Sequence, residues 1–400
     1  MVAIAGFTRD QIVAAVQQMY GEVATEPSRQ YHFPTGREAC LFVGYPENWL
    51  EGLPASALES FAGVGFPFRA GAIKAGDRVL DIGSGSGTDT LIAARLVCPE
   101  GRVYALDMTP EMLDKLRRNV ALAGAASVEV IEGNAEAIPL PDASVDVVTT
   151  NGVLNLVPDK PKAFAEIFRV LGPGGRVQIA DIMLSRPVGP KARTDPKLWA
   201  ECVVGAMIED DYLDLFRSAG FSDVTVLRSF DYFSGSSSSD TRRIAGVLGA
   251  KAAEMAMEKP STTRSAAVRW AERMQPARLV RRARQHGTAG MLASLAAVAA
   301  CYGVLAVVGG LAFLGLAVPI DARVWTGLIV ALAAMAPLAI AWNLPVHRNV
   351  GPVLLGGAGT LLVLYAFLGS YDWRIEAAGF AALLAAALLD RHLFRSAVNC

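Results

Sequence analysis

The segment Val79-Leu-Asp-Ile-Gly-Ser-Gly-Ser-Gly-Thr-Asp89 decides the fold of this chain. Its first part belongs to the apolar run Arg78–Ile82, which is typical of a buried parallel strand. A helical pattern begins at Thr88, and three glycines at alternate positions separate it from the strand: Gly83, Gly85 and Gly87. Glycines let the backbone approach a ligand closely, and the start of a helix offers unpaired N–H groups. The segment therefore predicts the strand, glycine loop and helix that open a nucleotide-binding α/β unit.

The residues around this loop favour S-adenosylmethionine over a dinucleotide as the ligand. A dinucleotide site carries Gly-x-Gly-x-x-Gly, whereas this chain has Asp81-x-Gly-x-Gly-x-Gly. The next predicted strand, Arg102–Asp107, ends in an acid that can bond both hydroxyls of an adenosine ribose. A glycine turn without any ligand is the alternative, and Asn134 fits an adenine contact and a plain turn residue equally well. We predict cofactor contacts at Asp81, Gly83, Ser84, Gly85, Gly87, Asp107, Met108, Asn134, Ala135 and Asn151.

Alternating strand and helix patterns surround the loop. Strands separated by helices pair in parallel and are covered on both faces, so we expect an α/β fold with a Rossmann-like sheet that resembles the class I methyltransferases. The predicted strands cover residues 79–82, 102–107, 128–132, 145–151, 176–181 and 223–228, with a turn at 172–175. The predicted helices cover residues 88–97, 109–124, 162–171, 211–219 and 241–257. An amphipathic helix around residues 11–20 begins an N-terminal segment on the substrate side.

The character of the sequence changes at Gly290. Three long apolar runs without charge follow, and a fourth, shorter run contains Glu376; they cover residues 290–318, 324–342, 350–369 and 375–389. A membrane span needs about 20 apolar residues, so the fourth run must borrow flanking residues such as Trp373 and Leu393. We predict an all-α transmembrane domain of about four helices, with three as the alternative. The predicted boundaries are 1–70 for the N-terminal segment, 71–258 for the catalytic domain, 259–288 for a basic linker and 289–395 for the spans.

Basic residues flank the spans at both ends of this region: Arg278, Arg281, Arg282, Arg284, Arg391 and Arg395. Positively charged loops remain in the cytoplasm, so we expect a multi-pass protein of the cytoplasmic membrane whose catalytic domain faces the cytosol. The whole chain of 400 residues has a net charge of −1, which argues against nucleic acid as a partner. Its five cysteines form no Cys-x-x-Cys pair, which argues against disulfides and a structural metal site.

Residues from about 36 to 250 resemble the arsenite methyltransferases. The matching pieces shared with quinone and sterol methyltransferases are Asp107-Met-Thr-Pro-Glu-Met-Leu113, Asn155-Leu-Val-Pro-Asp-Lys160 and Arg169-Val-Leu-Gly-Pro-Gly-Gly175. The pieces more particular to the arsenite branch are Cys202-x-x-Gly-Ala206 and Asp231-Tyr-Phe-Ser-Gly-Ser-Ser237. The resemblance implies S-adenosylmethionine as methyl donor, a thiol-bound metalloid as acceptor and a thiol reductant as a further partner.

The same resemblance implies which residues hold the acceptor, because the family binds trivalent arsenic through cysteine thiolates, soft ligands for a soft metalloid. Cys40 stands where the family has an N-terminal cysteine, and Cys202 where it has an arsenic ligand. The family's other two cysteines are replaced by Val64 and Gly152. Asn151 ends the fourth predicted strand and should face the methyl donor, so the candidate catalytic residues are Cys202, Cys40 and Asn151.

Two further hypotheses remain open for the function. A hydrophobic acceptor, such as a quinone or a lipid taken from the bilayer, is the chemical alternative to arsenic. The membrane part also faintly resembles small mercury transport proteins, notably in residues 363–369 and 379–390, with Cys301 as its one cysteine. Under that hypothesis the membrane part moves a metal and the methyltransferase-like domain is a sensor.

Overall fold

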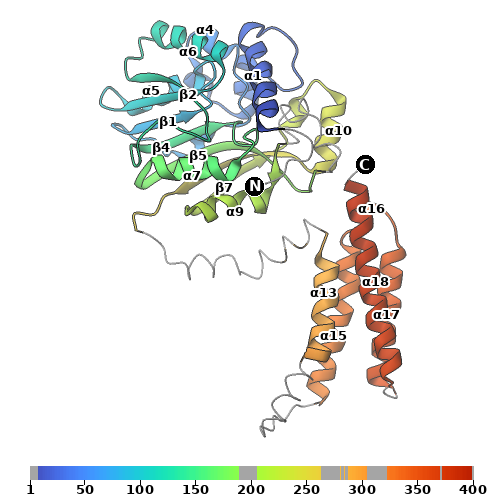
Figure 1. The fold of residues 1–400 in the computed structure, drawn as a ribbon. Helices are drawn as coiled ribbons and strands as arrows, with labels where there is room; N and C mark the ends of the chain where they lie inside the picture. The colour runs from blue at the N-terminus through green and yellow to red at the C-terminus, as the bar shows by residue number, and fades with distance from the viewer. Residues whose placement is uncertain are drawn as a thin grey trace. The chain divides into compact units, whose positions relative to one another are not determined.

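A computed structural model describes residues 8–188, 205–262, 280, 283, 287–303, 322–369 and 372–398. The chain divides into two compact units, Met1–Arg273 and Met274–Cys400. The first unit combines one sheet with helices, and the described part of the second unit is helical (Figure 1).

The first unit is built on an eight-stranded sheet. Its order is β3-β2-β1-β4-β5-β8-β7, and the short β6 pairs with β5. The strands are β1 (Arg78–Ile82), β2 (Arg102–Asp107), β3 (Val128–Glu132), β4 (Val145–Asn151), β5 (Leu171–Leu184), β6 (Met207–Ile208), β7 (Ser222–Phe230) and β8 (Lys251–Glu258). Strands β1 to β5 run parallel, whereas β8 is antiparallel to both of its neighbours. The strand order reverses between β1 and β4, and open α/β sheets bind ligands at the carboxyl ends of such strands.

Helices cover both faces of the sheet, as predicted. Val79 packs into a core that includes Ile12 and Leu91, and the next residue, Leu80, packs into a second core that includes Phe164. Successive strand residues point to opposite faces, which explains why β1 is apolar throughout. The helices preceding β4 are α1 (Arg9–Thr25), α2 (Gly36–Val43), α3 (Glu47–Leu50), α4 (Ala55–Leu58), η1 (Pro67–Ala70), α5 (Thr88–Val97) and α6 (Pro110–Leu122). Those that follow β4 are α7 (Lys160–Val170), α9 (Glu209–Ala219), η3 (Phe233–Gly235) and α10 (Ser239–Leu248).

The helix predicted over residues 241–257 is wrong in its second half. Helix α10 ends at Leu248, Gly249 adopts a left-handed conformation with φ of 60°, and β8 follows. The residues of β8, Lys-Ala-Ala-Glu-Met-Ala-Met-Glu, mostly favour helix. Pairing with β5 on one side and β7 on the other overrides this preference, and four apolar side chains of the strand are buried: Ala252, Ala253, Met255 and Met257. The observed sheet is therefore mixed.

The predicted turn at residues 172–175 is a bulge within β5. Strand β4 pairs through Val145 with Leu171 and through Val147 with Arg176, so the intervening residues of β5 loop out. The backbone N–H of Gly174 donates to the carbonyl of Lys259 (2.9 Å), and the N–H of Lys259 donates to the carbonyl of Gly175 (2.7 Å). The residue directly after β8 thus fastens the bulge.

The second unit contains α13 (Ala289–Val298), which continues into the π-helical turn η4 (Ala299–Gly303), then α15 (Ala322–Ala341), α16 (Leu344–His347), α17 (Gly351–Leu368) and α18 (Trp373–Val398). Among the described residues, three helical segments are long and apolar enough to cross a membrane: Thr326–His347, Gly351–Leu368 and Trp373–Ala397. The last includes Trp373 and Leu393, the flanking residues that the prediction borrowed. The predicted span 290–318 begins in the shorter apolar helix Ala289–Tyr302, and its remainder lies outside the described residues.

Small residues let α17 and α18 approach closely. A Cβ on Gly359 would lie 2.9 Å from the carbonyl oxygen of Gly379, so neither position can take a larger residue without moving a helix. Large apolar side chains face outward instead; Leu338, Leu354 and Leu361 are each about two-thirds exposed or more. Exposed apolar surface of this kind marks a face that contacts lipid or a protein partner.

Candidate active site

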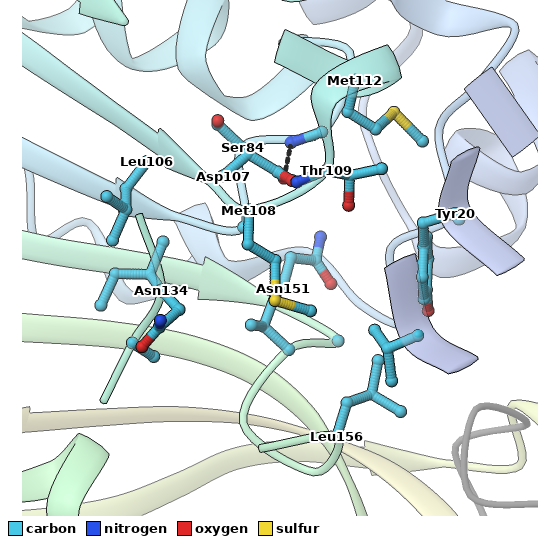
Figure 2. A pocket seen from close by; sticks show the side chains of 18 of the residues that line it. Tyr20, Ser84, Leu106, Asp107, Met108, Thr109, Met112, Asn134, Asn151 and Leu156 are labelled. Atoms are coloured by element: carbon cyan, nitrogen blue, oxygen red, sulfur yellow. Dashed lines mark hydrogen bonds between the residues drawn. The ribbon is translucent and has the colours of Figure 1, made fainter. Parts of the chain in front are cut away.

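A pocket opens at the carboxyl ends of β1, β2 and β4. Figure 2 shows Asp107, Met108, Asn134 and Asn151 around it, with Tyr20 on the side opposite Asn134 in this view. Eight of the ten predicted cofactor residues line it: Gly83, Ser84, Gly85, Asp107, Met108, Asn134, Ala135 and Asn151. The other two, Asp81 and Gly87, do not line the pocket.

Two of the three alternate glycines leave no room for a side chain. A Cβ on Gly83 would lie 2.3 Å from Val153 Cγ2, and one on Gly87 would lie 2.6 Å from Leu116 Cδ1. Gly85 has space for a Cβ, but like the other two it has a positive φ, here 52°. The loop therefore needs glycine at each position, for space or for backbone conformation.

Asp107 joins the glycine loop to the next helix. Its Oδ2 accepts the backbone N–H of Gly85 at 2.8 Å, and its Oδ1 accepts the N–H of Thr109, the N-cap of α6, at 2.8 Å. Each carboxylate oxygen can accept a second bond, so the acid can also receive the two hydroxyls of a ribose. Burial raises the pKa of Asp107, and the two backbone N–H groups oppose that rise.

Three buried acids surround the loop: Asp81, Asp89 and Asp107. Burial raises the pKa of Asp81 to about 8 and that of Asp89 to about 6. Among the described residues that line the pocket, the only basic one is Arg9, and its Nε already pairs with Glu136 Oε2 at 2.5 Å. A ligand with positive charge would reduce the cost of ionising these acids. The sulfonium and ammonium groups of S-adenosylmethionine meet this requirement.

Ser84 offers a polar contact that the described part of the chain does not use. Its Oγ is buried, lines the pocket and has no hydrogen-bond partner among the described residues. A buried hydroxyl without a partner is costly, and a bound polar ligand removes that cost. Together with the glycine loop and the acids, this hydroxyl fits the adenosyl donor that the sequence predicts.

Asn134 acts as a turn residue. Its Oδ1 accepts the backbone N–H of Glu136 at 2.9 Å, and the residue forms an isolated bridge with Ala137. Its side chain lines the pocket (Figure 2). The structure thus shows the turn directly, and the contact with adenine stays a prediction.

Asn151 anchors the N-terminal segment to the sheet. Its Oδ1 accepts the N–H groups of Val64 (2.8 Å) and Gly65 (3.2 Å). Its Nδ2 lies 2.9 Å from the carbonyl of Gly65, 3.0 Å from Asp89 Oδ2 and 3.1 Å from the hydroxyl of Tyr45. That hydroxyl in turn donates to Asp89 Oδ1 at 2.5 Å. The side chain lines the pocket, but its amide is occupied by the protein, which points to a positioning role.

The predicted acceptor cysteines are not found at the pocket in the described residues. Cys40 is buried in α2 and does not line the pocket, and burial raises the pKa of its thiol. Cys202 lies outside the described residues. The two positions where the arsenite resemblance expects further thiols face one another, since a Cβ on Gly152 would lie 3.2 Å from Val64 Cγ1. The catalytic roles of Cys40, Cys202 and Asn151 stay predictions.

Comparison with known proteins identifies the pocket-bearing part of the chain. Residues 73–220 match the family model described as a methyltransferase domain. Residues 73–220 are a methyltransferase domain. S-adenosylmethionine is the cofactor of this domain.

The methyltransferase domain is similar to proteins with different acceptors. An arsenite methyltransferase of Halobacterium salinarum is 43% identical over 164 residues, which cover 41% of this chain and 42% of that protein. A ubiquinone/menaquinone biosynthesis C-methyltransferase of Cronobacter sakazakii is 38% identical over 126 residues, which cover 31% of this chain and 49% of that protein. A solved structure of an arsenic(III) S-adenosylmethionine methyltransferase from Chlamydomonas reinhardtii has a TM-score of 0.44 and 31% identity, covering 57% of this chain and 74% of that one. The chain thus spans less than half the length of either of the two relatives.

Helix α1 contributes to the methyltransferase pocket in a way that the sequence analysis missed. Tyr20 lines the pocket (Figure 2), Gln17 Nε2 donates to the carbonyl of Met108 at 2.8 Å, and Arg9 pairs with Glu136. The sequence predicted that this helix begins a segment on the substrate side, but nothing local indicated which of its residues reach the pocket. The bond between Gln17 and Met108 joins residues 91 positions apart.

Proposed function

We propose that the chain is a membrane-attached S-adenosylmethionine-dependent methyltransferase that acts on trivalent arsenic or a related thiol-bound metalloid. The pocket at the glycine loop and the buried acids around that loop support S-adenosylmethionine as the methyl donor. Similarity to arsenite methyltransferases and the match at Cys202 support the acceptor half. Three helices long and apolar enough to span a membrane support the attachment.

The chemistry is an in-line displacement at a methyl carbon. The donor supplies an electrophilic methyl group bound to a positively charged sulfur. A lone pair of the acceptor forms the new bond to carbon as the bond from carbon to sulfur breaks, and that bond's electrons remain on sulfur in a neutral thioether. No proton has to move when arsenic is the nucleophile, so positioning and exclusion of water supply most of the acceleration.

The residues of this chain contribute an apolar enclosure and a fixed wall. Val13 and Val16 from α1, Phe61 from the N-terminal segment and Leu156 after β4 line the pocket and keep water out. The amide of Asn151 holds the segment around Gly65 in place. External thiols would complete the coordination of arsenic beside Cys202, which makes a thiol reductant part of the proposed reaction.

A hydrophobic organic acceptor is the second candidate, and one observation favours it. No cysteine lines the pocket among the described residues, and the neighbouring positions 64 and 152 carry valine and glycine. The similarity to a quinone-pathway C-methyltransferase supports the same candidate. The outward-facing leucines of the second unit are apolar surface of the kind that contacts lipid, which is the source from which such an acceptor would come.

A direct transfer assay separates these candidates. Full-length protein in detergent is given methyl-labelled donor with arsenite and glutathione, or with membrane lipid extract. We expect label in arsenicals, lost in Cys202→Ser and retained in Cys98→Ser, because Cys98 is exposed and does not line the pocket. Label in the lipid extract would favour the hydrophobic acceptor. Absence of transfer to either would favour metal transport with a sensor domain.

A further inference from the structure

One end of the second unit gathers basic side chains. Met291 near the start of α13, Ile340 near the end of α15, Val353 near the start of α17 and Ala387 of α18 pack into one cluster. Three helix ends therefore lie together beside the C-terminal half of α18. We call this the basic end, because it carries three arginines, Arg348, Arg391 and Arg395.

The one carboxylate at the basic end among the described residues already has partners. Asp390 is buried, its Oδ2 accepts from Asn343 Nδ2 at 2.7 Å, and its Oδ1 lies 2.9 Å from His347 Nε2. His347 Nδ1 accepts the backbone N–H of Asn349 at 3.1 Å, which leaves Nε2 to donate to Asp390. This network locks the loop between α15 and α17 onto α18 and leaves Asp390 engaged.

Arg391 has no anionic partner in the described part of the chain. Its Nε is buried and has no hydrogen-bond partner among the described residues, and its Nη1 faces the thioether sulfur of Met291 at 3.4 Å. Arg348 and Arg395 are exposed, and neither pairs with an acid in the described part of the chain. A buried donor without an acceptor is costly, and a guanidinium matches a phosphate with two parallel bonds.

The surroundings of these arginines fit a lipid. Trp342 and Leu388, near the same end, are each more than half exposed, and aromatic residues prefer the boundary between membrane and water. The opposite end of α18 has a different charge pattern, since its acids Asp372 and Glu376 flank the single Arg374. An excess of basic over acidic residues at one end of an apolar bundle is typical of contact with anionic head groups.

We propose that the basic end binds the phosphate of an anionic phospholipid, with Arg391 as the principal ligand and Arg348 and Arg395 as supporting charges. This site lies outside the methyltransferase domain, and the proposal does not depend on which acceptor is methylated.

Lipid binding to the full-length protein tests the proposal. Detergent-purified protein is titrated with phosphatidylglycerol or phosphatidylcholine, and retained lipid is counted by native mass spectrometry. We expect preferential retention of phosphatidylglycerol, weakened about fivefold or more in Arg391→Gln. Arg374→Gln is the matched control on the same helix and should bind as the wild type does. Equal retention of the two lipids, or unchanged binding in Arg391→Gln, would overturn the proposal.

Two further measurements keep the test decisive. If inorganic phosphate raises the unfolding temperature as much as phosphatidylglycerol does, the site accepts free phosphate and the assignment to a lipid is wrong. If Arg391→Gln does not fold, the double variant Arg348→Gln/Arg395→Gln is used instead, because it replaces only exposed side chains. It should also bind phosphatidylglycerol more weakly, and unchanged binding would count against the site.

Discussion

Gly152 lies against Val64, so close that a Cβ on Gly152 would sit 3.2 Å from Val64 Cγ1. These are the two positions at which the arsenite resemblance expects cysteines. They are distant in sequence, but the anchoring of the N-terminal segment by Asn151 brings them together. The two replacements thus affect a single spot beside the pocket, where glycine and valine fit one another.

The contact between these residues predicts coupled effects on stability. Gly152→Ala should lower the free energy of unfolding by about 1–2 kcal/mol, because φ at this position is +74° and the new methyl meets Val64. In a Val64→Ala background the same change should cost less, by about 0.5–1 kcal/mol, because the crowding is relieved. Calorimetry of the wild type, the two single variants and the double variant measures the interaction energy between the two positions. Strictly additive losses would contradict the contact.

Asp107 is expected to control donor affinity. Asp107→Ala should weaken binding of S-adenosylmethionine by about tenfold to a hundredfold, because a buried carboxylate that bonds ribose hydroxyls is lost. Isothermal titration measures the change. Glu132→Ala, at the end of the neighbouring strand β3 and outside the pocket lining, is the control and should bind normally. Normal affinity in Asp107→Ala would exclude the ribose contact.

The buried acids predict a dependence on pH. The pKa of Asp89 is raised to about 6 and that of Asp81 to about 8, so the folded protein without donor holds these protons more tightly than the unfolded chain does. Their contribution to stability is therefore full below pH about 4 and is lost as the pH rises through about 6 to 8. A cationic ligand favours the ionised acids, so donor affinity should increase between pH 5.5 and 7.5.

The neutral product provides the control for this charge effect. S-adenosylhomocysteine lacks the sulfonium charge, so its affinity should rise less over the same pH range. Titrations of both compounds at the two pH values give the comparison. An equal rise for both would mean that the acids do not respond to the sulfonium.

The donor side of the fold could be predicted from sequence because its signals are local. The glycine loop, the strand that precedes it and the acid that ends β2 lie within 30 residues, and the pocket forms around them. Strand β8 could not be predicted, because its residues favour helix and become a strand only by pairing with β5 and β7. The hydrogen bonds of Asn151 could not be predicted either, because its partners Tyr45 and Asp89 are 106 and 62 positions away in the sequence.

The position of β8 predicts where the chain can be truncated. A chain ending at residue 262 keeps β8 and Lys259, whose Nζ also donates to the carbonyls of Phe168 (2.7 Å) and Leu171 (2.6 Å). It should be soluble and bind the donor. A chain ending at residue 250 lacks β8, exposes an edge of β5 and should aggregate. Gel filtration and donor titration of both chains test this boundary. Failure of the longer chain to fold would mean that the second unit completes the enzyme.

The positive flanking residues predict the topology. With four spans, the C-terminal Cys400 faces the cytosol together with the methyltransferase domain. In intact cells that carry a Cys98→Ser variant, an impermeant thiol reagent should leave Cys400 unlabelled, and permeabilisation should expose it. Labelling of intact cells would contradict four spans and favour three.

The anchoring of the pocket wall also has a consequence for synthesis on the ribosome. The backbone N–H of Phe66 donates to Glu254 Oε1, 188 residues later in the chain, and the neighbouring Arg69 pairs with the same carboxylate. At about 5–20 residues per second, the ribosome needs roughly 10–40 seconds to make that interval. During this time β8 is absent, so Phe66 and Arg69 lack the carboxylate that fixes the pocket wall and the phenylalanines of the N-terminal segment stay more exposed. A nascent chain stalled before residue 254 should therefore be a client of chaperones that bind exposed aromatic side chains, and one released after residue 262 should not.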